Sequence, residues 1–243
     1  MSEIVTPGNT KTKIQITQRD REILRLCLEQ KFLTFEHVES FFPESSTKNL
    51  TSRRVGILKD SGIIKILASN VLKRQYIMTL TSFGETVARQ DYAIELDTNL
   101  KPQRSTLVHD SIVTSVRLKF GCLFPDSKWM PERAIKPMDL DYLPDGIVEM
   151  LCGERIAIEV ENSIKWYARY HALMRKDWSE LPFDKVLFVA TSEKIATSIE
   201  RCISSAPERP IFGVMRLSEL LNNNPIFSDK KRHSWRLESR EVA

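Results

Sequence analysis

The sequence predicts an α+β protein with two folded parts. Residues 15–92 contain apolar residues at helical spacing and then two short runs in which apolar and polar residues alternate. Residues 186–190 form a continuous apolar run, which is typical of a strand buried on both faces. Periodicity weakens around Pro102, which indicates a linker. The predicted parts are a flexible arm (1–14), a helical domain (15–92), a linker (93–104), an α/β domain with a mixed sheet (105–225) and a basic tail (226–243).

Composition places the chain among ordinary globular proteins, with 42% hydrophobic and 28% charged residues in a length of 243. The sequence has no apolar run near the ~20 residues that a membrane span needs, and its start lacks the pattern of a signal peptide. We therefore expect a cytoplasmic protein without membrane insertion. The net charge of +4 permits nucleic-acid binding. No CxxC pair occurs, so we expect reduced core thiols and no zinc site at Cys27, Cys122, Cys152 and Cys202.

In the first domain, Thr17 has the character of an N-cap, with Asp20 at the third helical position. Further helices are expected over 35–41 and from Ser46 to Asp60. A hairpin should pair 63–67 with 75–80, and a last helix should begin at Ser82 with Glu85 completing a capping box.

Three helices and a hairpin define a winged helix, whose third helix enters the DNA major groove while the wing contacts the backbone. Basic and hydrogen-bonding side chains on the third helix and the wing tip suit phosphates and base edges. A solvated helix face on a protein-binding winged helix is the alternative. The candidate DNA-binding residues are Lys48, Asn49, Ser52, Arg53, Arg54, Lys73 and Arg74.

The second domain has the predicted order α-β-β-β-α-β-α-β, which fits an α/β sandwich. Its expected elements are a helix (105–120), a strand (129–135), an acidic hairpin, a helix (163–178), a strand (185–191), a helix (194–204), a strand (210–215) and the start of a final helix (217–221).

The acidic hairpin joins residues 143–149 to residues 155–161. Asp145 opens its first strand, and the strand period of two puts Glu159 and Glu161 on one face of the second. Like charges gathered at one end of a hairpin repel unless a cation lies among them, and oxygen ligands favour Mg²⁺ or Mn²⁺. A surface hairpin with solvated acids is the alternative.

The order of His109-Asp110, Pro144-Asp145-Gly146 and Glu159-Val160-Glu161 behind a winged helix resembles the MobC-class plasmid mobilisation relaxases of the replication-relaxation superfamily. The resemblance implies a restriction-endonuclease-like core of the PD-(D/E)xK type. It also implies nicking of one strand at a plasmid transfer origin, together with an accessory mobilisation protein and a coupling protein. The chain departs from the PD-(D/E)xK pattern at Glu161, where lysine is usual.

Asp145 and Glu159 are the expected metal ligands, with Glu161 as a further ligand or as a base. Asp110 is a candidate for another carboxylate, and His109 for orienting it or the phosphate.

Lys165 is a candidate to replace the missing lysine, and the alternative is that it is a solvated residue. Arg169 is a candidate to hold a DNA phosphate. The nucleophile is either metal-activated water or one of three tyrosines; these are Tyr142, Tyr167 and Tyr170.

Two functions stay open on these residues. One is a metal-dependent strand-nicking relaxase. The other is a non-catalytic DNA-binding regulator of plasmid replication or transcription with a degenerate endonuclease-like domain. A homodimer is compatible with either.

Overall fold

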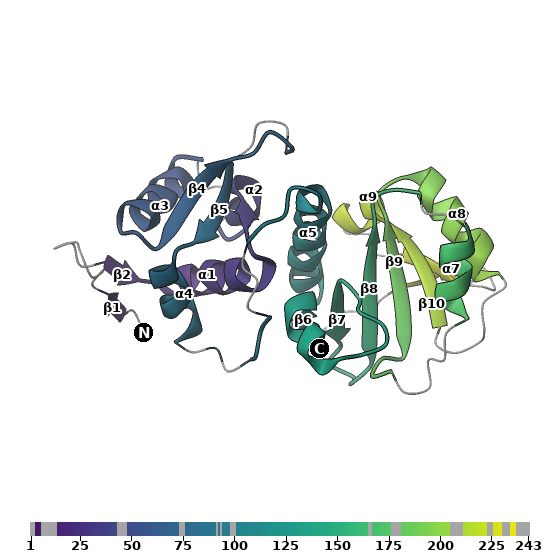
Figure 1. The fold of residues 1–243 in the computed structure, drawn as a ribbon. Coiled ribbons are helices and arrows are strands. Elements are labelled where there is room, and N and C mark those ends of the chain that lie inside the picture. The colour runs from purple at the N-terminus through teal and green to yellow at the C-terminus, as the bar shows by residue number, and fades with distance from the viewer. Residues whose placement is uncertain are drawn as a thin grey trace. The chain divides into compact units, whose positions relative to one another are not determined.

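The structure is a computed structural model that divides into two compact units, Met1–Thr114 and Ser115–Ala243 (Figure 1). Its helices, its mixed sheet and a separate antiparallel sheet confirm the predicted α+β class. The structure describes residues 3–5, 14–42, 48–72, 76–90, 92, 94–97, 101–164, 167–175, 181–204, 211–222, 226–229 and 234–236.

The first unit combines helices with a three-stranded antiparallel sheet of order β3-β5-β4. The predicted hairpin is present as β4 and β5, and the short strand β3 adds to it. The elements are α1 (Gln18–Gln30), β3 (Leu33–Thr34), α2 (Phe35–Glu39), α3 (Lys48–Asp60), β4 (Ile64–Ala68), β5 (Tyr76–Leu80) and α4 (Ser82–Arg89).

The helix starts follow local hydrogen bonding. Thr17 caps α1 as predicted, because its amide donates to the Asp20 carboxylate at 2.7 Å and its hydroxyl accepts from the Asp20 amide at 3.3 Å. α4 begins at Ser82 as predicted, but the capping residue is Thr81, whose hydroxyl accepts from the Gly84 amide at 3.0 Å. The capping box predicted from Ser82 is therefore wrong.

A buried ion pair joins α1 to α3. The Asp20 side chain is only 1% exposed and receives the Arg54 guanidinium, with Nε 2.7 Å from Oδ1 and Nη2 close to Oδ2. The same Nη2 donates to the carbonyl of Gln15 at 2.8 Å. A buried carboxylate is costly unless it is paired and hydrogen-bonded, and Asp20 meets both conditions.

The segment predicted as a flexible arm contains a strand, and that prediction is wrong for its described part. β1 (Glu3–Val5) pairs antiparallel with β2 (Ile14–Ile16). Ile14 and Ile16 are buried, so apolar burial at alternate positions of β2 fixes which of its faces is covered.

The second unit is built on a seven-stranded mixed sheet of order β12-β11-β10-β9-β8-β7-β6. Strands β6, β7 and β8 are antiparallel, whereas β8, β9 and β10 are parallel. The elements are β6 (Lys128–Pro131), α6 (Glu132–Ile135), a 3₁₀ turn (Lys136–Met138), β7 (Gly146–Glu149), β8 (Arg155–Glu161), α7 (Tyr167–Met174), β9 (Lys185–Ala190), α8 (Glu193–Ile203), β10 (Ile211–Arg216), α9 (Leu217–Leu221), β11 (Ile226–Asp229) and β12 (Ser234–Arg236). Helix α5 (Leu107–Leu123) crosses the boundary between the units.

Helices α7 and α8 cover one face of this sheet (Figure 1) and share a core with its apolar side chains. On the opposite face, the Phe120 and Trp129 rings lie 6.1 Å apart. A Cβ added at Gly146 would come within 2.4 Å of the Trp129 ring, so this approach requires glycine.

Three sequence predictions need correction here. The tail predicted for 226–243 contributes strands β11 and β12 to the sheet edge. The strand predicted over 129–135 ends at Pro131, where α6 follows. Cys27 and Cys202 are buried thiols as expected, whereas Cys122 and Cys152 are exposed.

None of the helices in the described ranges is both long and apolar enough to span a bilayer.

His37 is a buried histidine that caps α2. Its Nδ1 accepts from the Thr34 amide at 3.1 Å, and the Thr34 hydroxyl accepts from the His37 amide at 3.3 Å. Burial lowers the pKa of His37 from 6.5 to about 4, and a hydrogen bond to the Ser111 backbone partly opposes this. His37 therefore folds in its neutral form.

Gly84→Ala should strongly destabilise the first unit, because a Cβ there would lie 1.9 Å from the carbonyl oxygen of Ile63. We expect a loss of roughly 2–3 kcal/mol in the free energy of unfolding. Gly56→Ala is the matched control: it lies inside α3 with nothing within 4 Å, so it should stabilise by about 0.5–1 kcal/mol. Denaturant unfolding followed by circular dichroism checks both, and equal effects of the two variants would contradict the close approach.

The first unit should lose stability as the pH falls from 6.5 towards 4. In this window His37 binds a proton in the unfolded state but stays neutral in the folded state. From about pH 7.5 to about pH 5 the loss amounts to about 2 kcal/mol. Hydrogen exchange of the α2 amides measures it. His37→Gln should flatten this dependence and His171→Gln should not; an unchanged slope in His37→Gln would refute the assignment.

Candidate acidic site

The register of β7 and β8 positions the three predicted acids. Gly146 pairs with Ile158, so Asp145 lies beside Glu159 at the end of the ladder. The Asp145 amide donates to the Ile158 carbonyl at 3.0 Å, and the Asp145 carboxylate accepts from the Val160 amide at 2.7 Å. Backbone hydrogen bonds therefore hold Asp145 against β8.

Glu159 and Glu161 share one face of β8, as the alternation predicts. Their partners on β9 are Phe188 and Ala190, which belong to the core beneath α7 and α8. Glu161 is only 2% exposed, and Glu159 is partly buried. Glu161 is therefore not a solvated surface acid.

Tyr142 joins the acids into one site. Its hydroxyl donates to Glu159 Oε1 at 2.5 Å, and its ring lies edge-on to Phe183 at 6.0 Å. Burial raises the pKa of Tyr142 well above its usual value; the charge of Glu159 raises it further, as do those of Asp145 and Glu161. Glu159 is the acid that contacts this hydroxyl directly. We call Tyr142, Asp145, Glu159 and Glu161 the acidic site.

The surroundings of the candidate tyrosines differ. Tyr142 stays protonated and acts as a hydrogen-bond donor, a role that the sequence did not suggest. Tyr170 is buried, with its ring edge-on to Phe188 at 6.2 Å, so it packs as a core aromatic. The side chain of Tyr167 lies outside the described residues.

Carboxylate oxygens at a strand end suit a hard cation such as Mg²⁺ or Mn²⁺. Hydrogen bonds to Asp145 and Glu159 from the Val160 amide and the Tyr142 hydroxyl orient these two carboxylates, as such donors do for metal ligands. Within the described ranges, no group of three or more His, Cys, Asp and Glu side chains is arranged to hold a metal ion. Joint ligation by Asp145, Glu159 and Glu161 stays a prediction.

The remaining predicted catalytic residues lie in other parts of the chain. His109 and Asp110 lie in the first turn of α5 and belong to the first unit. The Asp110 carboxylate accepts from the Thr106 hydroxyl at 2.8 Å, a contact within the start of the helix. Arg169 is exposed on α7, and Lys165 lies outside the described residues.

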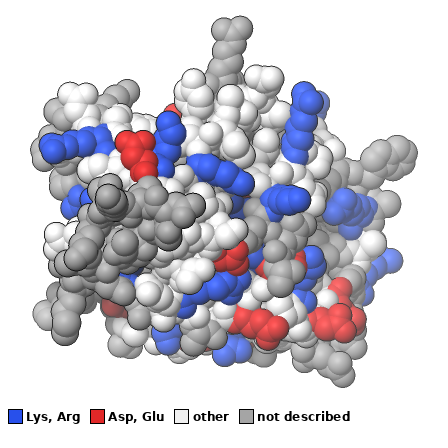
Figure 2. Space-filling model, turned by 60° about the vertical axis from the view of Figure 1, so that its left-hand side comes forward, with Lys and Arg blue, Asp and Glu red and all other residues white. Residues whose placement is uncertain are grey.

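The predicted DNA-binding residues fall into three groups. Asn49, Ser52 and Arg53 are exposed on α3. Arg54 is committed to Asp20 instead. On the face seen in Figure 2, described lysines and arginines are separated by uncharged and acidic side chains. Outside the described residues lie the side chain of Lys48 and all of Lys73 and Arg74.

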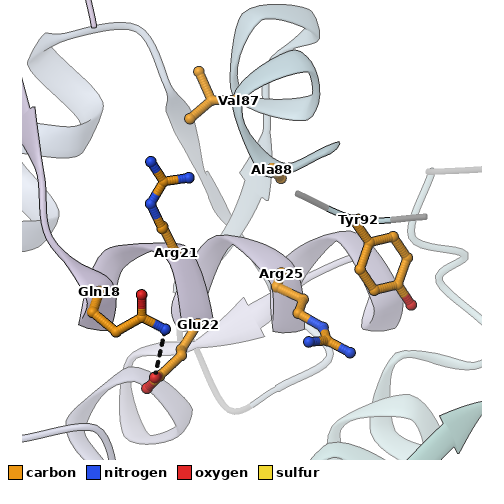
Figure 3. A pocket seen from close by; sticks show the side chains of 7 residues that line it. All are labelled: Gln18, Arg21, Glu22, Arg25, Val87, Ala88 and Tyr92. Carbon is orange, nitrogen blue, oxygen red and sulfur yellow. Dashed lines mark hydrogen bonds between the residues drawn. The ribbon is translucent and has the colours of Figure 1, made fainter. Parts of the chain in front are cut away.

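A shallow cavity of about 170 Å³ lies between α1 and α4 in the first unit (Figure 3). Arg25 lies over the Tyr92 ring at 4.9 Å and pairs with Glu29 at 3.1 Å. Gln18 donates to Glu22 at 3.2 Å. These contacts pair polar side chains of the cavity lining with partners in the same unit. None of the acids of the acidic site lines this cavity.

Comparison with protein-family models, with curated proteins and with solved structures found no match for this chain.

Tyr142→Phe should destabilise the second unit by about 1–3 kcal/mol, because Glu159 would lose a buried donor. Combining it with Glu159→Gln should give less than the sum of the two single effects. Denaturant unfolding followed by tryptophan fluorescence measures the stability of the two single variants and of the double variant. Tyr76→Phe, at an exposed tyrosine, is the control and should change little. Additive effects of Tyr142→Phe and Glu159→Gln would contradict the coupling.

Proposed function

We propose that this chain is a metal-dependent DNA strand-nicking enzyme whose first unit binds duplex DNA. The observation that carries the proposal is geometric: Asp145 lies beside Glu159 at the end of the β7–β8 ladder, and the buried Glu161 shares the Glu159 face of β8. Such a concentration of negative charge in a partly buried site is costly without a cation. A divalent cation would offset it, and would also stabilise charge on a phosphate.

The order of elements supports an endonuclease-like core. A helix precedes three antiparallel strands, and α7 leads to β9, which is parallel to β8. This order is the one that the resemblance to PD-(D/E)xK nucleases implies. In the first unit, the order α1-β3-α2-α3-β4-β5 supports a winged helix, with α3 as the helix that enters the major groove.

Each group of the acidic site receives a role in the proposed mechanism. Asp145 and Glu159 would hold the ion, and Glu161 would add a ligand or accept a proton. The ion would supply an activated water and a positive charge beside the phosphate. Tyr142 orients Glu159 through its hydroxyl, and this hydrogen bond commits the hydroxyl to a carboxylate instead of a phosphate. Water is therefore the nucleophile that we favour over Tyr142.

A relaxase acting at a plasmid transfer origin, with an accessory mobilisation protein and a coupling protein, is the specific form that the resemblance suggests. Glu161 at the usual lysine position favours the second candidate, a non-catalytic DNA-binding regulator. Retention of all three acids on one sheet face favours the enzyme, because buried carboxylates without a function destabilise the fold.

The test is relaxation of supercoiled plasmid carrying the cognate origin, with Mg²⁺ or Mn²⁺. We expect nicking by the full chain and a loss of at least about 100-fold in Glu159→Gln, because that variant removes a charge from the ion's ligand set. Asp126→Asn, at an exposed acid of the same unit, is the control and should nick normally.

Normal nicking by Glu159→Gln would refute the assigned site. DNA binding without nicking under any divalent ion would favour the regulator.

A further inference from the structure

The outward face of α3 has an arginine flanked by exposed aliphatic side chains. Leu50 is 49% and Ile57 38% exposed, and Arg53 between them is also exposed. Positions 50, 53 and 57 follow i, i+3, i+7 spacing and therefore lie in one row. The opposite row, with Thr51, Val55 and Leu58, is buried. The packing of α3 therefore leaves the first row open.

Arg54 sharpens this pattern. Its guanidinium donates hydrogen bonds to Asp20 on α1 and to the Gln15 carbonyl. Arg53 is therefore the cation of the outward row. Among the described residues of α3, an aliphatic–arginine–aliphatic row therefore accompanies the predicted polar face. A phosphate-binding surface alone would not need two exposed aliphatic side chains.

We infer that this row reads base edges in the DNA major groove, with Leu50 and Ile57 contacting thymine methyl groups and Arg53 contacting a guanine between them. The inference rests on the proposed DNA binding and deepens it. Thymine is the base that presents a methyl group in that groove, and arginine pairs with the guanine O6 and N7 atoms. Asn49, exposed one turn before Arg53, adds a hydrogen-bonding side chain to the same end.

Helix geometry gives the spacing of the site. Seven residues at about 1.5 Å each separate Leu50 from Ile57 by roughly 10 Å along the axis, which is about three base steps of 3.4 Å. We therefore expect thymines about three base pairs apart with a guanine between them.

Area argues against a protein partner on this row. Two half-exposed aliphatic side chains supply only a small part of the roughly 800 Å² per partner that a stable interface buries, and a central arginine suits nucleic acid.

The experiment selects duplexes that the full chain binds from a random-sequence pool, and then replaces their thymines with uracil one at a time. Uracil lacks the methyl group, so we expect roughly fourfold weaker binding at each of two positions, equivalent to the roughly 0.8 kcal/mol of one buried methyl group. Leu50→Ala should abolish the penalty at one position and Ile57→Ala at the other. Leu221→Ala removes an exposed leucine of the second unit and should keep both penalties.

The outcomes separate the two proposals. Duplex binding with equal affinity for thymine and uracil DNA would overturn the inference and leave the proposed function standing. Failure to bind any duplex would overturn both. If light scattering showed a dimer that Leu50→Ala dissociates, the row would be a protein interface and the inference would fall.

Discussion

The acidic site depends on the hydrogen bonds that lock Asp145 against β8. The Asp145 amide and carboxylate both bond to the β8 backbone, at Ile158 and at Val160. They continue the β7–β8 ladder beyond its last paired residue and fix its register. A shift by one residue would turn Glu159 and Glu161 to the opposite face of the sheet, where Val148 and Ile158 now lie. The placement of the acids is therefore a consequence of strand register.

Much of this architecture could be predicted from local pattern. The apolar run of β9, the alternation in β8 and the N-cap at Thr17 each give a short-range signal, and each element is present. Other features depend on tertiary contacts. Strands β1, β11 and β12 are short segments that gain their hydrogen bonds from partners elsewhere, so composition alone read them as an arm and a tail.

The candidate site residues also divide into those that local pattern predicts and those that depend on tertiary contacts. Their strand positions put Glu159 and Glu161 on one face, and the structure has them there. The sequence could not indicate that Tyr142 donates to Glu159, because Tyr142 lies in an irregular segment before β7 and the two residues are 17 positions apart. It also could not separate Arg53 from Arg54. Adjacent arginines on a helix have identical chemistry, and only the buried Asp20 on another helix decides which one remains exposed.

The same ion pair shows why counting basic residues on a helix overestimates its contact surface. Arg54 stabilises the packing of α1 on α3, and truncating it would leave the Asp20 charge buried with fewer partners, which typically costs several kcal/mol. A loss of DNA binding after such a change would report unfolding of the first unit rather than a lost phosphate contact.

The contact between Gly146 and the Trp129 ring bears on how related sequences should be compared. Because the indole fills the space of a side chain at that position, glycine would persist there in any related sequence that keeps this packing of the sheet. Asp145 before it is held differently, through hydrogen bonds to the β8 backbone. An intact glycine at position 146 of a related sequence would therefore report the packing of the sheet and nothing about the acids beside it.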